Sequence, residues 1–276
     1  MDLLHAIALG IVEGLTEFVP VSSTGHLILA GSWLGLNSTP AQKAAVDAFD
    51  IVIQAGAWLA CVVWYAPLLR SRLLDFRSKD AALRQRALHL GLGVAIAFVP
   101  VMLAGLVLRK TIKALFFGPA PVAVALALGG VAMIGTEWAL RRRVGGKALD
   151  AMNPRAAVVI GIAQCAALIP GTSRSMATII GARLCGFDTR AAADFSFLLA
   201  VPVLGAATAY ELLKEWRVLW TGIGPAALIV GMVTSFVFGW ASIAGFLRVI
   251  GRYGLAPFGV YRILLAALVW ATLVAK

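Results

Sequence analysis

Residues 20–26 read PVSSTGH and interrupt an apolar region that extends over residues 3–36. Residues 170–175 read PGTSRS and interrupt a second apolar region, 156–186, in the same way. Neither half of either region has the roughly 20 apolar residues that a membrane-crossing helix needs. Backbone that breaks at membrane depth is tolerated only where it packs inside protein or lines a wet cavity. We therefore expect each region to form a re-entrant pair of half-helices with its turn inside the protein.

The composition of the whole chain places both turns in a membrane protein. Of the 276 residues, 61% are hydrophobic and 13% are charged, whereas a soluble domain carries about 25% charged residues. Apolar stretches long enough to cross a bilayer occupy most of the remaining chain, so the expected fold is an all-α polytopic membrane protein with six transmembrane helices and two re-entrant pairs. The expected spans are 47–66, 87–108, 119–140, 192–213, 223–247 and 256–275.

The two turns are 150 residues apart when Pro20 is aligned with Pro170 and Ser23 with Ser173. This spacing predicts a tandem repeat in which each copy contains one re-entrant pair and three spans. An odd number of spans turns the second copy upside down relative to the first, so the repeat is of the inverted type. The expected units are a single membrane domain (1–276), repeat one (1–145, with its pair at 3–36) and repeat two (150–276, with its pair at 156–186).

The basic residues support this arrangement. The formal net charge is +11, and the loop at 70–86 holds six basic and two acidic residues, while the loop at 141–155 holds five basic residues and one acidic residue. Basic loops stay in the cytoplasm, which predicts that these two loops lie on the same side of the membrane. Aromatic residues do not alternate with the basic runs as they do in single-strand-binding proteins, so no nucleic acid is expected as a partner.

Glu13 and Glu17 are four residues apart, which places both carboxylates on one face of a helix. Acidic residues inside apolar segments usually have a function, and an amphipathic surface helix with its acids in water is the alternative. After the break, Ser22, Ser23 and Thr24 bring hydroxyls and backbone N–H groups to a helix N-terminus, where anions bind. A simple N-cap is the competing interpretation of these hydroxyls.

The second turn carries Ser173, Arg174, Ser175 and, one helical turn later, Thr178. A guanidinium at mid-membrane requires an anionic partner, and its planar fork fits a phosphate bidentately. An internal ion pair between Arg174 and one of the two glutamates is the structural alternative. Both interpretations bring the two turns together.

Together these groups suit a phosphorylated ligand with a divalent cation. Mg²⁺ is commonly held by one or two carboxylates plus the phosphates of the substrate, so we expect Glu13 and Glu17 to be the metal ligands, with Ca²⁺ as the other candidate ion. Ser23 and His26 are three residues apart, which would let the imidazole remove the hydroxyl proton during attack on phosphorus. Arg174 would stabilise the charge that develops on the phosphoryl group.

Two motifs, EGLTEFVPVSSTGH at 13–26 and PGTSRSMAT at 170–178, resemble the signatures of the undecaprenyl-diphosphate phosphatase (UppP or BacA) family of bacterial membrane enzymes. The resemblance covers essentially the whole chain, including FDIVIQ at 49–54 and FSFLLAVP at 195–202. It implies hydrolysis of the lipid carrier's diphosphate to the monophosphate, which supplies carrier for peptidoglycan synthesis and is linked to bacitracin resistance. It also implies a location in the bacterial inner membrane, with a prenyl diphosphate lipid as substrate and membrane lipids as partners.

Carried over by motif position, the resemblance implies that Ser23 is the nucleophile, that His26 is its catalytic partner and that Arg174 binds phosphate. Glu13 and Glu17 correspond to the acidic pair of the family. The further phosphate-binding residues that we expect are Ser22, Thr24, Ser173, Ser175 and Thr178.

The alternative function is a lipid or small-anion transporter or flippase, because inverted repeats with broken helices are a transporter architecture. A hydroxyl nucleophile beside a base distinguishes hydrolysis from transport. The sequence leaves open a homodimer, the face from which the site is reached, and whether Ser23 or a metal-bound water attacks.

Overall fold

The computed structural model describes residues 1–116, 118–141 and 145–275, without the side chains of residues 109, 110 and 113. These residues form α-helices joined by turns, and the β pairing among them is one isolated bridge between Lys147 and Phe187. The fold is all-α, as the composition predicts. The helices are α1 (Leu3–Thr16), α2 (Ser23–Trp33), α3 (Pro40–Phe76), α4 (Ala81–Phe116), α5 (Pro119–Leu140), α6 (Pro154–Cys165), α7 (Arg174–Leu184), α8 (Thr189–Val218), α9 (Pro225–Tyr253) and α10 (Ala256–Val269).

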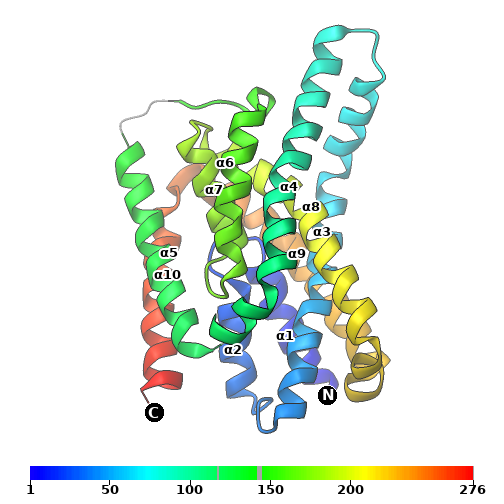
Figure 1. Cartoon of the computed structure of the whole chain (residues 1–276), viewed down its shortest axis with the longest axis vertical. Coiled ribbons are helices and arrows are strands. Elements are labelled where there is room, and N and C mark those ends of the chain that lie inside the picture. Colours follow the sequence, from blue (N-terminus) through cyan, green and yellow to red (C-terminus); the bar gives the residue numbers. More distant parts are fainter. Residues whose placement is uncertain (117, 142–144, 276) are drawn as a thin grey trace.

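Among the described residues, six helical segments are long and apolar enough to cross a membrane: α3, α4, α5, α9, and also α8 and α10, which π-helical turns extend to Ile223 and Val274. The chain is therefore a multi-pass membrane protein, and each expected span falls on one of the six. α5 begins and ends where the sequence predicts, whereas α3 has 37 residues, a length of about 55 Å against a hydrocarbon core of about 30 Å. Figure 1 shows the joined ends of α3 and α4 projecting beyond the other helices.

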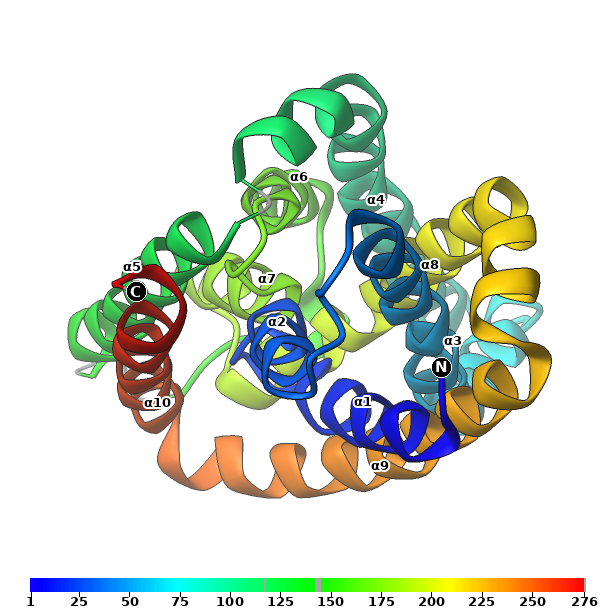
Figure 2. The same cartoon turned by 90° about the horizontal axis from the view of Figure 1, so that it is seen from below.

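The four remaining helices form two hairpins, α1 with α2 and α6 with α7. They contain 14, 11, 12 and 11 residues, too few to cross a bilayer. In Figure 1, α1 and α2 occupy the end of the bundle where both termini lie, and α6 enters from the opposite end. In the projection of Figure 2, α2 and α7 both lie near the centre of the bundle. The re-entrant path and the boundaries of the two repeats stay predictions.

Local sequence signals explain where the hairpins and spans begin. Thr39 accepts a hydrogen bond from the backbone N–H of Gln42 ahead of α3, and Asn153 accepts one from Ala156 ahead of α6. In both helices a proline follows the capping residue, where its missing N–H is not needed. At α1 the cap is Asp2, and the backbone N–H of His5 lowers the pKa of its carboxyl.

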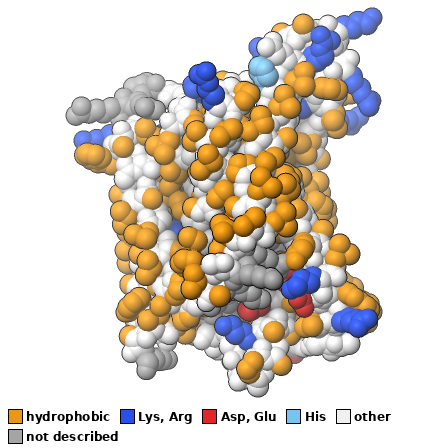
Figure 3. Space-filling model, viewed as in Figure 1, with side chains coloured by type: hydrophobic (Ala, Val, Ile, Leu, Met, Phe, Trp, Pro, Cys, Tyr) orange, Lys and Arg blue, Asp and Glu red, His pale blue; other side chains and the backbone are white. Residues whose placement is uncertain are grey.

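The surface of the bundle shows the two environments of a membrane protein. In Figure 3, hydrophobic side chains cover the middle of the visible face, and Lys and Arg gather at the projecting end of α3 and α4. The connection from α5 to α6 lies at this same end in Figure 1. The two basic loops therefore share one end, although residues 142–144 of the second loop lie outside the described residues.

Small residues bring α1 directly against the backbone of α9. A Cβ atom added to Gly10 would lie 2.6 Å from the carbonyl oxygen of Gly231, and one added to Gly14 would lie 2.6 Å from that of Ser235. Real Cβ contacts are longer, so larger residues would push the two helices apart. This packing fixes the position of α1, which carries the two glutamates at its inner end.

Candidate active site

Each turn ends in a serine with a strained backbone. Ser22 has φ 74° and Ser173 has φ 73°, and all other described residues with positive φ are glycines. The hydroxyl of Ser22 accepts from the N–H of Gly25, and that of Ser173 accepts from the N–H of Met176. Such strain costs about 1–3 kcal/mol for a residue with a side chain and concentrates at functional sites. The N-termini of α2 and α7 thus both open toward the turns, as anion-binding helix ends do.

The structure corrects the alignment of the two turns by one residue. The equivalent serines are Ser22 and Ser173, which are 173 − 22 = 151 residues apart. Ser23, which the sequence alignment paired with Ser173, instead matches Arg174, because each is the first residue of its helix. An alignment on Pro20 and Pro170 is therefore off by one residue, because the equivalent residues are the two serines with positive φ. The two turns therefore place a hydroxyl and a guanidinium at corresponding positions.

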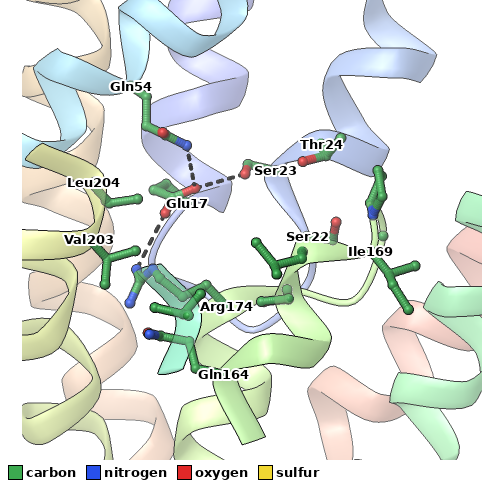
Figure 4. Close-up of a pocket in the computed structure, with 16 residues that line it drawn as sticks. Glu17, Ser22, Ser23, Thr24, Gln54, Gln164, Ile169, Arg174, Val203 and Leu204 are labelled. Carbon is green, nitrogen blue, oxygen red and sulfur yellow. Dashed lines mark hydrogen bonds and ion pairs between the residues drawn. The ribbon is translucent and has the colours of Figure 1, made fainter. Parts of the chain in front are cut away.

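Glu17 is the point at which the two turns meet. Ser23 Oγ donates to Glu17 Oε2 over 2.8 Å, and Arg174 Nη2 lies 3.3 Å from Glu17 Oε1. Gln54 Nε2 from α3 lies 3.5 Å from Oε2, at the limit of a weak hydrogen bond. Figure 4 shows the three side chains converging on this carboxylate from different helices. The ion pair expected as the structural alternative for Arg174 is present, and it leaves a hydroxyl and a guanidinium beside one carboxylate.

Arg174 is held at the start of α7 by contacts that leave part of its fork free. Its Nη1 donates to the carbonyl oxygen of Ser196 over 3.0 Å, while its Nε is buried without a hydrogen-bond partner among the described residues. Thr178 Oγ lies 2.8 Å from the carbonyl oxygen of Arg174 and 2.7 Å from Ser196 Oγ. Thr178 therefore braces α7 against α8.

The structure does not bring His26 to the Ser23 hydroxyl, contrary to the sequence interpretation. His26 Nδ1 lies 2.8 Å from the carbonyl oxygen of Ser22, and Nε2 lies 2.7 Å from the hydroxyl of Tyr261. A carbonyl oxygen only accepts, so Nδ1 carries the proton and Nε2 accepts from Tyr261. The i+3 spacing placed the ring near the turn correctly, but one ring nitrogen contacts the backbone of Ser22 and the other contacts Tyr261. The side chain that accepts the hydrogen bond of the Ser23 hydroxyl is Glu17.

Glu13 lies one turn before Glu17, and both of its oxygens are buried without a hydrogen-bond partner among the described residues. Asp50 of α3 has one such oxygen. The described part of the chain contains no group of three or more His, Cys, Asp or Glu side chains arranged to bind a metal. Two carboxylates still fit Mg²⁺, which takes its other ligands from water and from substrate phosphates. The unpartnered oxygens of Glu13 are the observation that favours a cation here.

A cavity of about 170 Å³ lies between the two turns. Figure 4 shows the side chains around it. The expected site residues that line it are Glu17, Ser22, Ser23, Thr24, Ser173 and Arg174. The expected residues that lie behind this wall are Glu13, His26, Ser175 and Thr178. Ser175 Oγ contacts Ser173 Oγ over 3.0 Å, so it reaches the cavity wall only through that hydroxyl.

Arg262 of α10 is a residue that the sequence analysis missed. Its side chain is completely buried and donates to the carbonyl oxygens of Pro20 and Gly171, one from each turn, and to those of Ala125 and Leu126 in α5. These hydrogen bonds connect both turns to α5 and α10. A charge in the middle of an apolar span is rare, and that signal could have identified it.

Comparison with known proteins identifies the family of this chain. The family model described as "Bacitracin resistance protein BacA" matches residues 6–268. A protein of Sorangium cellulosum named "Undecaprenyl-diphosphatase" is 50% identical over 267 residues, which is 96% of this chain and 84% of that protein. Proteins of Burkholderia mallei ("Undecaprenyl-diphosphatase") and Burkholderia pseudomallei ("Undecaprenyl-diphosphatase 2") are each 45% identical over 262 residues, covering 94% of this chain and 91% of theirs. The chain thus belongs to the BacA family of bacitracin resistance proteins.

Proposed function

We propose that this protein hydrolyses undecaprenyl diphosphate to undecaprenyl phosphate and inorganic phosphate in the bacterial cytoplasmic membrane. The observation that carries the proposal is the contact of Ser23 and Arg174 with the single carboxylate of Glu17 beside a cavity. A hydroxyl, a base and a cation at one point are the components that phosphoryl transfer to a side chain requires. The names of the relatives supply the lipid substrate. The reaction returns the lipid carrier to peptidoglycan synthesis and underlies bacitracin resistance.

Ser23 attacks the terminal phosphorus in this mechanism. Its Oγ–H points at Glu17 Oε2 over 2.8 Å, so the proton passes to the carboxylate while the Oγ–P bond forms. The bond from that phosphorus to the bridging oxygen breaks, and the lipid leaves as the monophosphate. Water then attacks this phosphorus, the Oγ–P bond breaks, and Ser23 Oγ recovers the proton held by Glu17. One proton of the water stays on the inorganic phosphate that leaves, and the other passes to solvent.

Arg174 stabilises the charge on the transferred phosphoryl group. Its Nε–H has no partner among the described residues, so it is available to a phosphate oxygen. The N–H groups at the starts of α2 and α7 supply further donors around the cavity. Groups fixed in place before the reaction stabilise the transition state without reorganising, which makes this kind of contact effective.

His26 acts by positioning in this proposal. Its Nδ1–H holds the carbonyl oxygen of Ser22 at 2.8 Å, and Tyr261 fixes the other nitrogen. The contact maintains the strained turn that directs Ser23 toward Glu17. Loss of the imidazole would therefore leave the Ser23 hydroxyl less well positioned, while Glu17 could still accept its proton.

A divalent cation would be held by Glu13 and Glu17 together with phosphate oxygens of the substrate. Bound there, it would neutralise charge on the diphosphate, which is the chemistry that Mg²⁺ supplies in phosphoryl transfer.

The size of the cavity supports a lipid substrate bound by its head group. At about 170 Å³ it is smaller than the 300–1,000 Å³ of sites that enclose a whole drug-sized ligand. A diphosphate fits a space of this kind, whereas the prenyl chain would lie outside it, among the apolar helix surfaces and membrane lipids. Recognition would then depend on the head group and on the bilayer.

Release of phosphate from undecaprenyl diphosphate by the purified, detergent-solubilised protein tests the proposal. We expect release of one phosphate per lipid, loss of activity with a chelator, and recovery when Mg²⁺ or Ca²⁺ is added back. A mock purification from the same cells without this protein is the control for contaminating phosphatases. Movement of the intact diphosphate lipid across vesicles without phosphate release would contradict hydrolysis and favour a transporter.

A further inference from the structure

Gln164 on α6 is a buried polar side chain that the mechanism above does not use. Its side chain has no exposed surface, and neither Oε1 nor Nε2 has a hydrogen-bond partner among the described residues. The residue lines the cavity between the two turns, opposite the hydroxyls of α2. More than nine in ten buried polar groups in native proteins have a partner, so an unpartnered carboxamide requires an explanation.

The position of Gln164 indicates what its partner is. Figure 4 shows it beside Arg174, and both residues line the same cavity. Arg174 Nε is also buried and unpartnered. The wall formed by these two side chains therefore offers two unused N–H donors and one unused carbonyl oxygen. A phosphate oxygen accepts from N–H donors of this type, so one phosphate group could accept from both side chains.

A comparison of the two hairpins supports a separate role for this amide. Glu13 lies nine residues before the strained Ser22, and Gln164 lies nine residues before the strained Ser173. Both side chains are buried and unpartnered. A carboxylate repels phosphate and attracts a cation, whereas a carboxamide of nearly the same shape donates hydrogen bonds to an anion. At this position the second hairpin thus carries a neutral donor that lines the cavity, whereas the first carries a carboxylate that does not line it.

We propose that Gln164 is a substrate-binding residue that donates through Nε2 to a non-bridging oxygen of the phosphate group held by Arg174. Arg174 Nε–H then donates to another oxygen of the same phosphate group. The proposal rests on the proposed function, because it assigns a residue to the same diphosphate site. It makes Gln164 a determinant of head-group affinity and leaves proton transfer to Ser23 and Glu17.

Steady-state kinetics of Gln164→Leu and Gln164→Glu test this assignment. We expect Leu to raise KM for the prenyl diphosphate and the inhibition constant of inorganic phosphate in parallel, by roughly 10- to 100-fold, with kcat within about threefold of wild type. Glu keeps the size but adds a negative charge, so both constants should rise further. Ser235→Ala is the matched control, because Ser235 Oγ is also buried and unpartnered but lies on α9, away from the cavity.

Unchanged KM and phosphate inhibition in a folded Gln164→Leu protein would overturn the assignment and leave the residue a packing role. Should that variant fail to fold, as judged by its elution and thermal midpoint, Gln164→Glu answers the same question with the same criterion. A wild-type protein that releases no phosphate would contradict the proposed function, and with it this inference. Active wild type with unaffected variants would contradict the inference alone.

Discussion

Glu17 is a buried carboxylate that depends on partners from both halves of the chain. Ser23 follows it in the first turn, Arg174 comes from the second, and Gln54 comes from α3. A buried charge that loses its partner costs several kcal/mol, so the three contacts support one another. The same carboxylate is the proton acceptor in the proposed mechanism. A substitution of Glu17 should therefore affect both the stability of the protein and its rate of hydrolysis.

The hydroxyls of the first turn should differ sharply in importance. Ser23→Ala removes the group bonded to Glu17, and we expect kcat to fall at least 100-fold. Ser22→Ala removes a capping contact to Gly25, with an expected loss of about 1 kcal/mol of stability and a much smaller loss of rate. Phosphate release and thermal midpoints of both variants check this. A fully active Ser23→Ala protein would instead indicate attack by a metal-bound water.

The guanidinium of Arg174 should not be replaceable by an ammonium. Arg174→Lys keeps the positive charge but cannot contact Ser196, Glu17 and a phosphate at once. We expect kcat to fall by about 10²–10³, the range found when one transition-state donor is lost. Arg190→Lys is the control, because Arg190 is an exposed residue paired with Asp194. Equal activity of Arg174→Lys and wild type would show that charge alone is required.

At the scale of elements, α10 connects the two turns through Arg262. Replacement by Leu removes the donor to the carbonyl oxygens of Pro20 and Gly171 in the turns, and each unsatisfied buried acceptor costs about 1–3 kcal/mol. The carbonyl oxygens of Ala125 and Leu126 lie inside α5 and keep backbone donors of that helix. We expect Arg262→Leu to lower the thermal midpoint in detergent by roughly 10 °C and to reduce kcat, with partial recovery in Arg262→Lys. Arg252→Gln, at the exposed end of α9, should change neither. A stable, active Arg262→Leu protein would show that the two turns keep their conformation without the hydrogen bonds from Arg262.

The sequence could predict most of the elements because their signals are local. Apolar length locates the six spans, and the two breaks locate the hairpins. The extent of α3 was underestimated because a helix can continue past the bilayer through residues such as Arg70 and Arg72, which are good helix formers. Arg262 and Gln164 were missed for a different reason. Their roles come from contacts with helices that are distant in sequence, and no local spacing reports such contacts.

Whether the two hairpins enter the membrane from opposite faces depends on the number of membrane crossings in each repeat, which must be odd. Cysteines introduced at Ser78 and Ala148, in a background without Cys61, Cys165 and Cys185, should both be labelled only from the cytoplasmic side. One at Gly118 should be labelled only from outside. Membrane-impermeant thiol reagents on intact and opened cells make this measurement. Labelling of Ser78 and Ala148 from opposite faces would exclude the inverted arrangement.

In the proposed mechanism, residues from both halves of the chain form one hydrolytic site. A double-mutant cycle with Glu17→Gln, Arg174→Gln and the combined variant measures it through kcat/KM for undecaprenyl diphosphate. Residues that act as a unit give strongly non-additive losses. For a shared site, we expect kcat/KM of the double variant to be within about threefold of that of the slower single variant. Losses that multiply in the double variant would show that the two turns act independently and would contradict a shared site.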